Sequence, residues 1–248
     1  MVLAFPSGAA TSGTAGALAY DPVLRSTDLF RSVDPDSAAA LAQEFERLDA
    51  ERGTVLFAEG DPGDRLYIVL SGKVKLSRSS GDGREGLMAL LGPTDHFGDF
   101  ELLDGGPRVV VAAVVADARL AVLPKTVLDR WIAHHPHVAE QLLRVIARGI
   151  RGHRAAVDDR LFSDVPGRVA SRIIQLAHRF GVAEDGATRV VHDLTQSELA
   201  QFVGASRESV NKVLAEYAAR GWLRLEHKCV VILDNAPLAR RAQHGRRR

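Results

Sequence analysis

The chain has 248 residues, of which 46% are hydrophobic and 25% charged, and its formal net charge is +1. This balance is ordinary for a globular protein, and no apolar run approaches the roughly 20 residues that a membrane helix needs. The chain lacks the basic and apolar start of a signal peptide. Its single cysteine, Cys229, excludes an internal disulfide and a cysteine-ligated iron–sulfur cluster, so we expect a cytoplasmic protein.

The first part of the chain predicts a disordered extension followed by a β-rich domain. Residues 1–20 are mostly small and polar without a hydrophobic period, and we expect disorder there. A short helix is predicted over 37–48. From 51 to 123, short β-type runs alternate with Gly, Pro and Asp turns, which predicts a small all-β sandwich or barrel. Strands are expected at 66–70 and 74–76, with Ser71 and Gly72 between them, and at 109–115 and 120–123.

A long helix is predicted from about 137 to 162. Five residues recur there at steps of four, three, four and four: Leu142, Ile146, Gly149, His153 and Val157. This spacing approximates a heptad seam and predicts a parallel dimer. A helix packed on its own β domain is the plain alternative.

The segment from 193 to 233 predicts two short helices followed by a pair of strands. Thr195 and Glu198 form a capping box that predicts a helix start. Gly204 predicts the turn after this helix, and Ser206 caps a second one. Each helix has an apolar face, formed by Leu199, Phe202 and Val203 in the first and by Val210, Val213 and Leu214 in the second. Strands at 222–226 and 229–233 would form a wing.

The second of these helices carries a polar outer face made of Arg207, Glu208, Asn211 and Lys212. Arginine can bind guanine bidentately and glutamate can accept from cytosine, so this face suits the major groove of DNA. A helical hairpin with a solvated, charged face is the alternative.

The charge distribution favours a polyanionic partner for the C-terminal part. The chain has 18 Lys and Arg against 22 Asp and Glu through Phe162, but 14 against 9 from Ser163 onward. The arginines at 240–241 and 246–248 supply much of this excess, either as a solvated tail or as phosphate contacts.

Three motifs resemble, in order, one family of bacterial transcription regulators, the Crp/Fnr family. Its recognition helix closely resembles VGASRESVNKVL at 203–214, and its approach to the DNA-binding domain resembles FSDVPGRVASRIIQLAHRFG from Phe162. Its sensor roll resembles EGDPGDRLYIVLSGKVKL from Glu59 and FGDFELLDGGPR from Phe97. The resemblance covers about 21–242 and is nearest to the actinobacterial cyclic-AMP-receptor-like branch.

The resemblance implies an α+β fold with an N-terminal cyclic-nucleotide-binding-type β-roll, a long dimerisation helix and a C-terminal winged helix-turn-helix. The expected divisions are a disordered extension at 1–20, a sensor domain at 21–136, the dimerisation helix at 137–162, the DNA-binding domain at 163–242 and a basic tail at 243–248.

The resemblance also implies that Arg207, Glu208 and Lys212 read bases in palindromic operators with TGTGA-like half-sites. Asn211 is placed to reach a base or a phosphate. Three further residues are placed for phosphate contacts, namely Thr195, Gln196 and Ser206. We expect double-stranded DNA, a second copy of the chain and RNA polymerase as partners, and no membrane.

The implied sensor pocket departs from its family. Relatives that bind cyclic AMP use a glutamate for the ribose and an arginine, followed by Ser or Thr, for the cyclic phosphate. Here Gly98 and Arg108 match, but Asp99 replaces the glutamate and Val109 the hydroxyl residue. Glu101 adds a carboxylate that, if it faces inward, repels an anionic ligand or takes its place.

Two larger residues, His153 and Arg154, stand where the relatives place a threonine and a small polar residue against the adenine. Arg154 could fill the base pocket and pair with Asp99 or Glu101. Each lost bond to a charged group is worth roughly 1.5–3 kcal/mol, so binding should weaken on the order of 10²- to 10⁴-fold. The candidate ligand-binding residues are Gly98, Asp99, Phe100, Arg108, Val109, His153 and Arg154.

Cyclic AMP is therefore the candidate cofactor, and we expect it to bind weakly, although Arg108 still permits binding. A roll that is already closed, or that senses another small effector, is the competing hypothesis.

Two other classes of function compete with a DNA-binding regulator. A ligand-binding module that acts on a protein partner is disfavoured by the intact Arg207, Glu208 and Lys212. An enzyme is not expected, because the chain shows no nucleophile elbow, metal ligand set or paired acids. The histidines at 134, 135 and 137 lack a standard zinc spacing, so no metal is expected.

Overall fold

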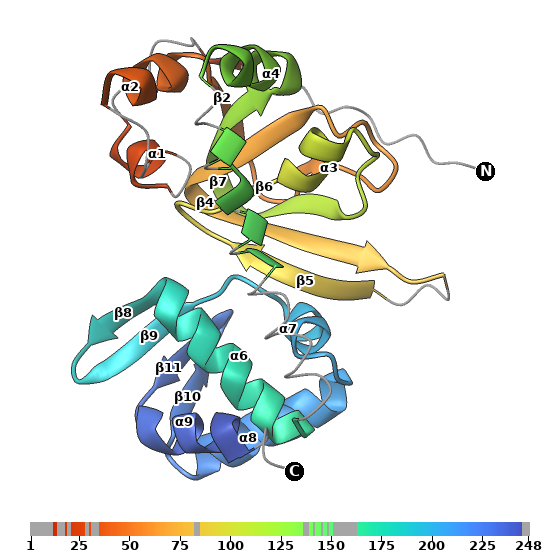
Figure 1. The fold of residues 1–248 in the computed structure, drawn as a ribbon. Coiled ribbons are helices and arrows are strands. Elements are labelled where there is room, and N and C mark those ends of the chain that lie inside the picture. Colours follow the sequence, from red (N-terminus) through yellow and green to blue (C-terminus); the bar gives the residue numbers. More distant parts are fainter. Residues whose placement is uncertain are drawn as a thin grey trace. The chain divides into compact units, whose positions relative to one another are not determined.

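The computed structural model describes residues 12–13, 18, 21–27, 30, 35–81, 85–135, 139–140, 142–144, 146–147, 149–150 and 163–244. The chain divides into two compact units (Figure 1). The N-terminal unit comprises Met1–Arg78 and Leu90–Ala147, and the C-terminal unit comprises Ser79–Ala89 and Arg148–Arg248.

Among the described residues, a sheet of 7 strands built mainly from the N-terminal unit has the order β1-β2-β7-β4-β5, with β3 paired to β7 and β6 paired to β4. The pairs of β2, β3 and β4 with β7 are antiparallel. The strands are β1 Ser12–Gly13, β2 Glu46–Ala50, β3 Val55–Phe57, β4 Arg65–Ser79, β5 Glu85–Leu91, β6 His96–Phe97 and β7 Val111–Pro124. This is the expected β-roll.

Two of these strands are longer than the sequence indicates. The runs predicted at 66–70 and 74–76 both belong to β4, and those at 109–115 and 120–123 correspond to the single strand β7. The register between β4 and β7 shifts around Ser71 and Lys73. Gly72 has a φ of 80°, and a Cβ there would lie 2.1 Å from the carbonyl oxygen of Asp117. The glycine therefore permits an irregularity within one strand instead of a turn between two.

Helices of the N-terminal unit pack against the sheet around one apolar cluster. The helices are α1 Pro22–Ser26, α2 Pro35–Gln43, α3 Asp99–Asp104 and α4 Lys125–His134. The cluster includes Leu41, Phe45, Ile68, Leu102 and Trp131. It buries the apolar faces of helices and sheet together, which is the main source of stability in such a layer arrangement.

Two expectations for the start of the chain are corrected. The helix predicted over 37–48 ends at Gln43, and Glu46–Ala50 pairs with β7 as β2. Within 1–20, Ser12–Gly13 pairs with β2, and Leu18 is 2% exposed in the apolar cluster. The prediction of disorder is therefore wrong for Ser12, Gly13 and Leu18, since Leu18 has an apolar side chain that the cluster can bury. The rest of 1–20 lies outside the described residues.

The long helix predicted over 137–162 lies largely outside the described residues. The described positions from 139 to 150 are helical. Leu142, from the predicted seam, is 5% exposed and belongs to the cluster of the N-terminal unit. Leu143 and Ile150 are 66% and 45% exposed. His153 and Val157 are not among the described residues.

The described part of the C-terminal unit contains a 4-stranded antiparallel sheet of order β10-β11-β9-β8. Its elements are α6 Val165–Phe180, β8 Gly181–Glu184, β9 Ala187–Val191, α7 Gln196–Val203, α8 Arg207–Ala219, β10 Leu223–Glu226, β11 Cys229–Ile232 and α9 Asn235–His244. The predicted wing strands are confirmed as β10 and β11. The hairpin of β8 and β9 and the helix α9 were not predicted.

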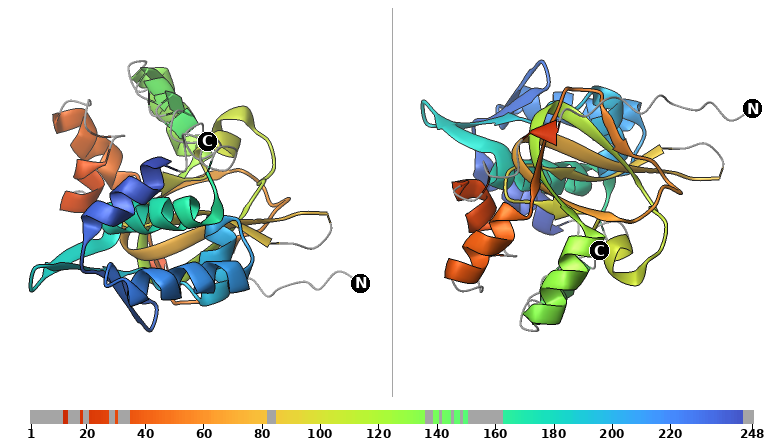
Figure 2. Two further views of the ribbon diagram at one scale, coloured as in Figure 1. Left: turned by 90° about the horizontal axis from the view of Figure 1, so that it is seen from below. Right: turned by 90° about the horizontal axis from the view of Figure 1, so that it is seen from above.

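The helix α6 organises this unit. Asp164 caps it by accepting a hydrogen bond from the Gly167 amide at 2.9 Å, and Pro166 lies in its first turn. Figures 1 and 2 show α9 beside α6, against which it packs. Arg241 of α9 forms an ion pair with Asp164, so the arginines at 240–241 belong to a docked helix and not to a solvated tail.

Candidate functional site

The α7–turn–α8 segment has the local geometry that the sequence predicts. The Thr195 hydroxyl accepts from the Glu198 amide at 3.2 Å, and the Glu198 carboxylate accepts from the Thr195 amide at 2.7 Å. Gly204 follows α7 with a φ of 74°, and Ser206 caps α8 by accepting from the Ser209 amide at 3.1 Å. The six predicted apolar positions of the two helices are buried. Packing thus turns the other side of α8 outward.

Gln196 links the two helices of this motif. Its Oε1 accepts from Arg207 Nη2 at 2.9 Å, from Arg207 Nε at 3.3 Å and from Asn211 Nδ2 at 3.3 Å. These three residues and Thr195 also line a pocket of about 380 Å³ between the helices and the wing. Four of the seven residues predicted to contact DNA therefore lie together. The sequence did not indicate that Gln196 would hold Arg207.

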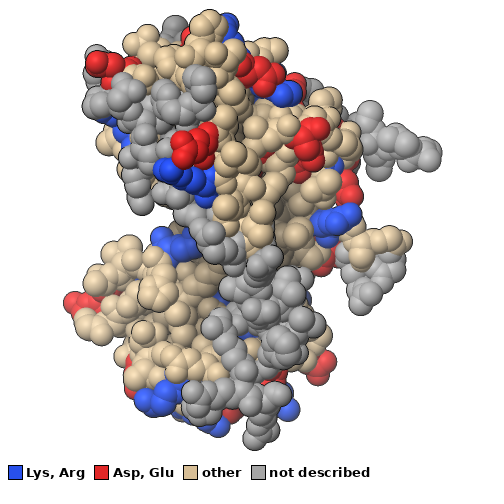
Figure 3. Space-filling model, viewed as in Figure 1, with Lys and Arg blue, Asp and Glu red and all other residues tan. Residues whose placement is uncertain are grey.

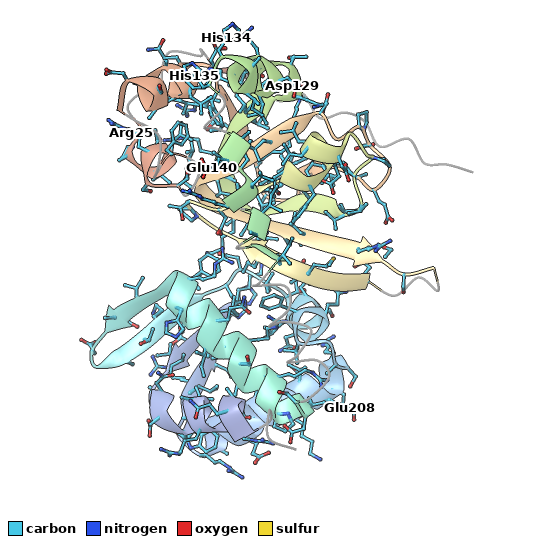
Figure 4. All side chains as sticks on the ribbon, in the orientation of Figure 1. Arg25, Asp129, His134, His135, Glu140 and Glu208 are labelled. Atoms are coloured by element: carbon cyan, nitrogen blue, oxygen red, sulfur yellow. The ribbon has the colours of Figure 1, made fainter. Side chains whose placement is uncertain are left out.

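The other predicted contact residues lie on the exposed side of α8. Glu208, Lys212 and Ser206 are exposed, and Figure 4 shows Glu208 at the outside of the unit. Arg207 is exposed as well, so its guanidinium combines solvent access with a fixed intramolecular acceptor. On the face drawn in Figure 3, described Lys and Arg side chains are interspersed with Asp and Glu and do not form one basic field.

Arg168 holds the turn between α7 and α8. Its Nη1 donates to the Ser163 carbonyl at 2.7 Å, while Nε and Nη2 donate to the carbonyls of Val203 and Gly204, each at 3.2 Å. The carbonyls at the end of α7 have no partner within their helix, so an arginine fork suits them. Sequence analysis missed this residue, because its acceptors are backbone groups without a sequence signature.

The strand β9, which pairs with the wing strand β11, has a second arginine that the sequence did not single out. Arg189 of β9 pairs with Glu184 at 2.7 Å and with Glu226 at 2.6 Å. Hydrogen bonds from Arg189 and Arg224 lower the pKa of Glu226. All of these groups are well exposed, so the pairs orient the strands more than they stabilise them.

In the N-terminal unit, Arg108 is buried beside Glu101. The Arg108 side chain is 1% exposed, and its Nη1 lies 3.3 Å from Glu101 Oε2. The guanidinium also donates to the carbonyls of Gly98 at 3.0 Å and Arg65 at 2.5 Å, and lies 4.3 Å above the Phe57 ring. Glu101 therefore faces inward, the condition under which it would oppose an anionic ligand.

The other candidate ligand-binding residues are arranged differently. Asp99 is buried, with its carboxylate 3.7 Å from the His96 ring. Phe100 and Val109 are 41% and 50% exposed, so both side chains are largely open to solvent. His153 and Arg154 lie outside the described residues, as does the predicted pairing of Arg154. Among the described residues, the carboxylate that contacts Arg108 is that of Glu101.

The described residues contain no cluster of His, Cys, Asp and Glu suited to a metal ion. Nor does any helix in this part of the chain have the length and apolarity to cross a membrane.

Each of the two units matches the model of a known protein family. Residues 47–135 match the model of the cyclic nucleotide-binding domain, and residues 167–241 match that of the Crp-like helix-turn-helix domain. The CRP-like cAMP-activated global transcriptional regulator of Mycobacterium tuberculosis is 51% identical over 223 residues, which cover 90% of this chain and 100% of the relative. The cyclic AMP receptor protein of Thermus thermophilus is 33% identical over 215 residues, covering 87% and 96%.

Solved structures agree with this fold. A transcriptional regulator of the CRP/FNR family from Thermus thermophilus matches with a TM-score of 0.67 at 27% identity, covering 79% of this chain and 98% of its own. The catabolite activator protein of the same organism matches with a TM-score of 0.51 at 32% identity, covering 88% and 99%.

Proposed function

This chain belongs to the Crp/Fnr family of DNA-binding transcription regulators, and we propose that it acts as a homodimer on palindromic operators with TGTGA-like half-sites. Its relatives are named as transcriptional regulators, which favours a regulator over an enzyme and over a module that lacks DNA binding. RNA polymerase would be its partner at promoters, and the cytoplasm its place of action.

The observation that carries the proposed operator reading is the exposed face of α8. Arg207 and Asn211 share Gln196 as acceptor on this face, while Glu208 and Lys212 are exposed beside them. In the proposed complex, Arg207, Glu208 and Lys212 read base edges in the major groove. Asn211 contacts a base or a phosphate. Phosphate contacts that set the register would come from Thr195, Gln196 and Ser206.

Exposed apolar residues support the proposed dimer. Leu143 and Ile150 are both exposed in a helical segment and lie one heptad apart. Each is one residue beyond a position of the predicted seam, Leu142 and Gly149, so the proposed seam is shifted from the predicted one. A second copy of the same helix would remove both side chains from water in a parallel seam. The proposed division is then a sensor at 21–136, a dimerisation helix at 137–162 and a DNA-binding domain at 163–242. The two reading helices would meet successive turns of the major groove, roughly 34 Å apart.

We expect operator binding to depend little on cyclic AMP. Relatives are named as cAMP-activated or as cyclic AMP receptors, but this chain has Asp99 and Val109 in the corresponding cassette, and its Arg108 is already paired. The dimer would therefore bind operators without ligand, or would respond to a different effector.

Selection of operators from random DNA, with and without cyclic AMP, tests these statements together. We expect inverted repeats related to TGTGA in both selections. In fluorescence anisotropy with a selected operator, Arg207→Ala should bind more weakly by about 1–3 kcal/mol of binding free energy. It should also lose the preference for guanine at the contacted position. Arg220→Ala is the matched control, because Arg220 follows α8 at its other end and pairs with Glu216. Equal losses for Arg207→Ala on operator and random DNA, or a monomer in sedimentation, would contradict the proposal.

A further inference from the structure

The sensor unit contains a buried cation whose charge is already balanced from within the chain. Among the described residues of this unit, the buried charged side chains are Asp99, Glu101 and Arg108. Glu101 and Arg108 are 7% and 2% exposed, and their charged atoms lie 3.3 Å apart. A buried guanidinium without a counter-charge is strongly disfavoured, so Arg108 requires an anion nearby. Glu101 supplies it.

Close backbone packing sets the position of this pair. A Cβ at Gly63 would lie 2.4 Å from the Cβ of Glu101, and a Cβ at Gly98 would lie 2.6 Å from Arg108 Nη1. Only glycine leaves room at these two positions. The first turn of α3 therefore lies close enough to the loop around Gly63 for Glu101 to reach inward, so the contact with Arg108 does not depend on a flexible surface side chain.

Most of the hydrogen-bonding capacity of Arg108 is used. Nη1 contacts both Glu101 and the Gly98 carbonyl, and Nη2 contacts the Arg65 carbonyl. Its Nε is buried and has no partner among the described atoms. An arriving anion would find this donor and the second N–H of Nη2, but it would also meet the carboxylate of Glu101. Because the Glu101 carboxylate lies 3.3 Å from Arg108 Nη1, it disfavours a further anion at this guanidinium.

We propose that Glu101 determines ligand specificity in the sensor unit by acting as an internal counter-ion of Arg108 and excluding phosphate-bearing ligands. The residue takes the place that a cyclic nucleotide phosphate would need at this arginine. This inference rests on the sensor role proposed above, and it explains the weak cyclic AMP dependence expected there. Its test measures ligand binding directly, so a failure of DNA binding leaves it unaffected.

Isothermal titration of the full-length chain with cyclic AMP provides the test. Glu101→Gln keeps the size of the side chain and removes its charge, so we expect cyclic AMP to bind on the order of 10- to 100-fold more tightly than to the wild type. Adenosine, which lacks the phosphate, should show no such gain. Adding Arg108→Gln to Glu101→Gln should abolish the gain.

Glu44→Gln is the matched control, because Glu44 forms an exposed ion pair with Arg130 in the same unit. The Glu44→Gln protein should bind cyclic AMP as the wild type does. A folded Glu101→Gln protein with wild-type affinity would overturn the proposal, as would an equal gain for adenosine. If Glu101→Gln does not fold, Glu101→Ser replaces it. Tighter cyclic AMP binding than the wild type, with unchanged adenosine affinity, supports the exclusion. Unchanged cyclic AMP affinity of Glu101→Ser, or saturation of the wild type by cyclic AMP at low micromolar concentration, refutes it.

Discussion

Replacing Arg168 by alanine should destabilise the C-terminal unit by about 2–3 kcal/mol. Two of its three acceptors, the carbonyls of Ser163 and Val203, belong to buried residues. Leaving a buried carbonyl without its charged donor costs about 1–1.5 kcal/mol each. The third acceptor, the carbonyl of Gly204, belongs to an exposed residue, where water replaces the arginine at little cost.

Urea unfolding followed by the fluorescence of Trp222 measures this effect, with Trp131→Phe as the common background because the chain has 2 tryptophans. With a slope of roughly 1.5 kcal/mol per M, the midpoint should fall by roughly 1.3–2 M. Arg224→Ala is the control: its ion pair with Glu226 is exposed, and its loss should cost at most about 0.5 kcal/mol. An Arg168→Ala protein as stable as this control would refute the reasoning.

Three further predictions concern the same unit. Thr195→Ala should lose about 1 kcal/mol of stability in urea, whereas Thr195→Ser, which keeps the capping hydroxyl, should not. Burial raises the pKa of Tyr217 to about 12, and an unfolded phenol titrates near pH 10. The contribution of Tyr217 to the free energy of unfolding is therefore complete below pH 10 and is lost as the pH rises toward 12. In Tyr217→Phe, this decline in the free energy of unfolding at alkaline pH should be absent. Gln196→Ala removes the acceptor that holds the Arg207 and Asn211 side chains. DNA binding must then order each of them, at a cost of about 0.5–1.5 kcal/mol of binding free energy per side chain. Operator affinity in anisotropy should fall at least roughly 2-fold, and an unchanged affinity would show that Gln196 does not position them.

Local signals in the sequence were sufficient where the interacting groups lie a few residues apart. The capping box of Thr195 and Glu198, the turn at Gly204 and the cap at Ser206 each depend on bonds within one helical turn. Such bonds form in the same way in most tertiary contexts, so both ends of α7 and the start of α8 were predictable.

Local signals misled where long-range pairing determined the outcome. Ser71 and Gly72 suit a turn, but antiparallel pairing with β7 extends β4 through them. The hairpin of β8 and β9 was missed because every residue of β8 is exposed, so that strand has no alternation of apolar and polar residues to detect. β8 belongs to the sheet because it pairs with β9 in antiparallel register.

By itself, the sequence determined the two helices after Asp193, the turn between them and the two strands that follow, because hydrophobic periods, caps and turn residues act over short distances. Its resemblance to the Crp/Fnr family implied the β-roll and the division of the chain. Only the tertiary structure decided that Glu101 turns inward to Arg108, that Gln196 holds Arg207 and that Arg168 reaches the carbonyls of Val203 and Gly204. These contacts join groups from different elements, and their partners are chosen by how the backbone packs around glycines and helix ends.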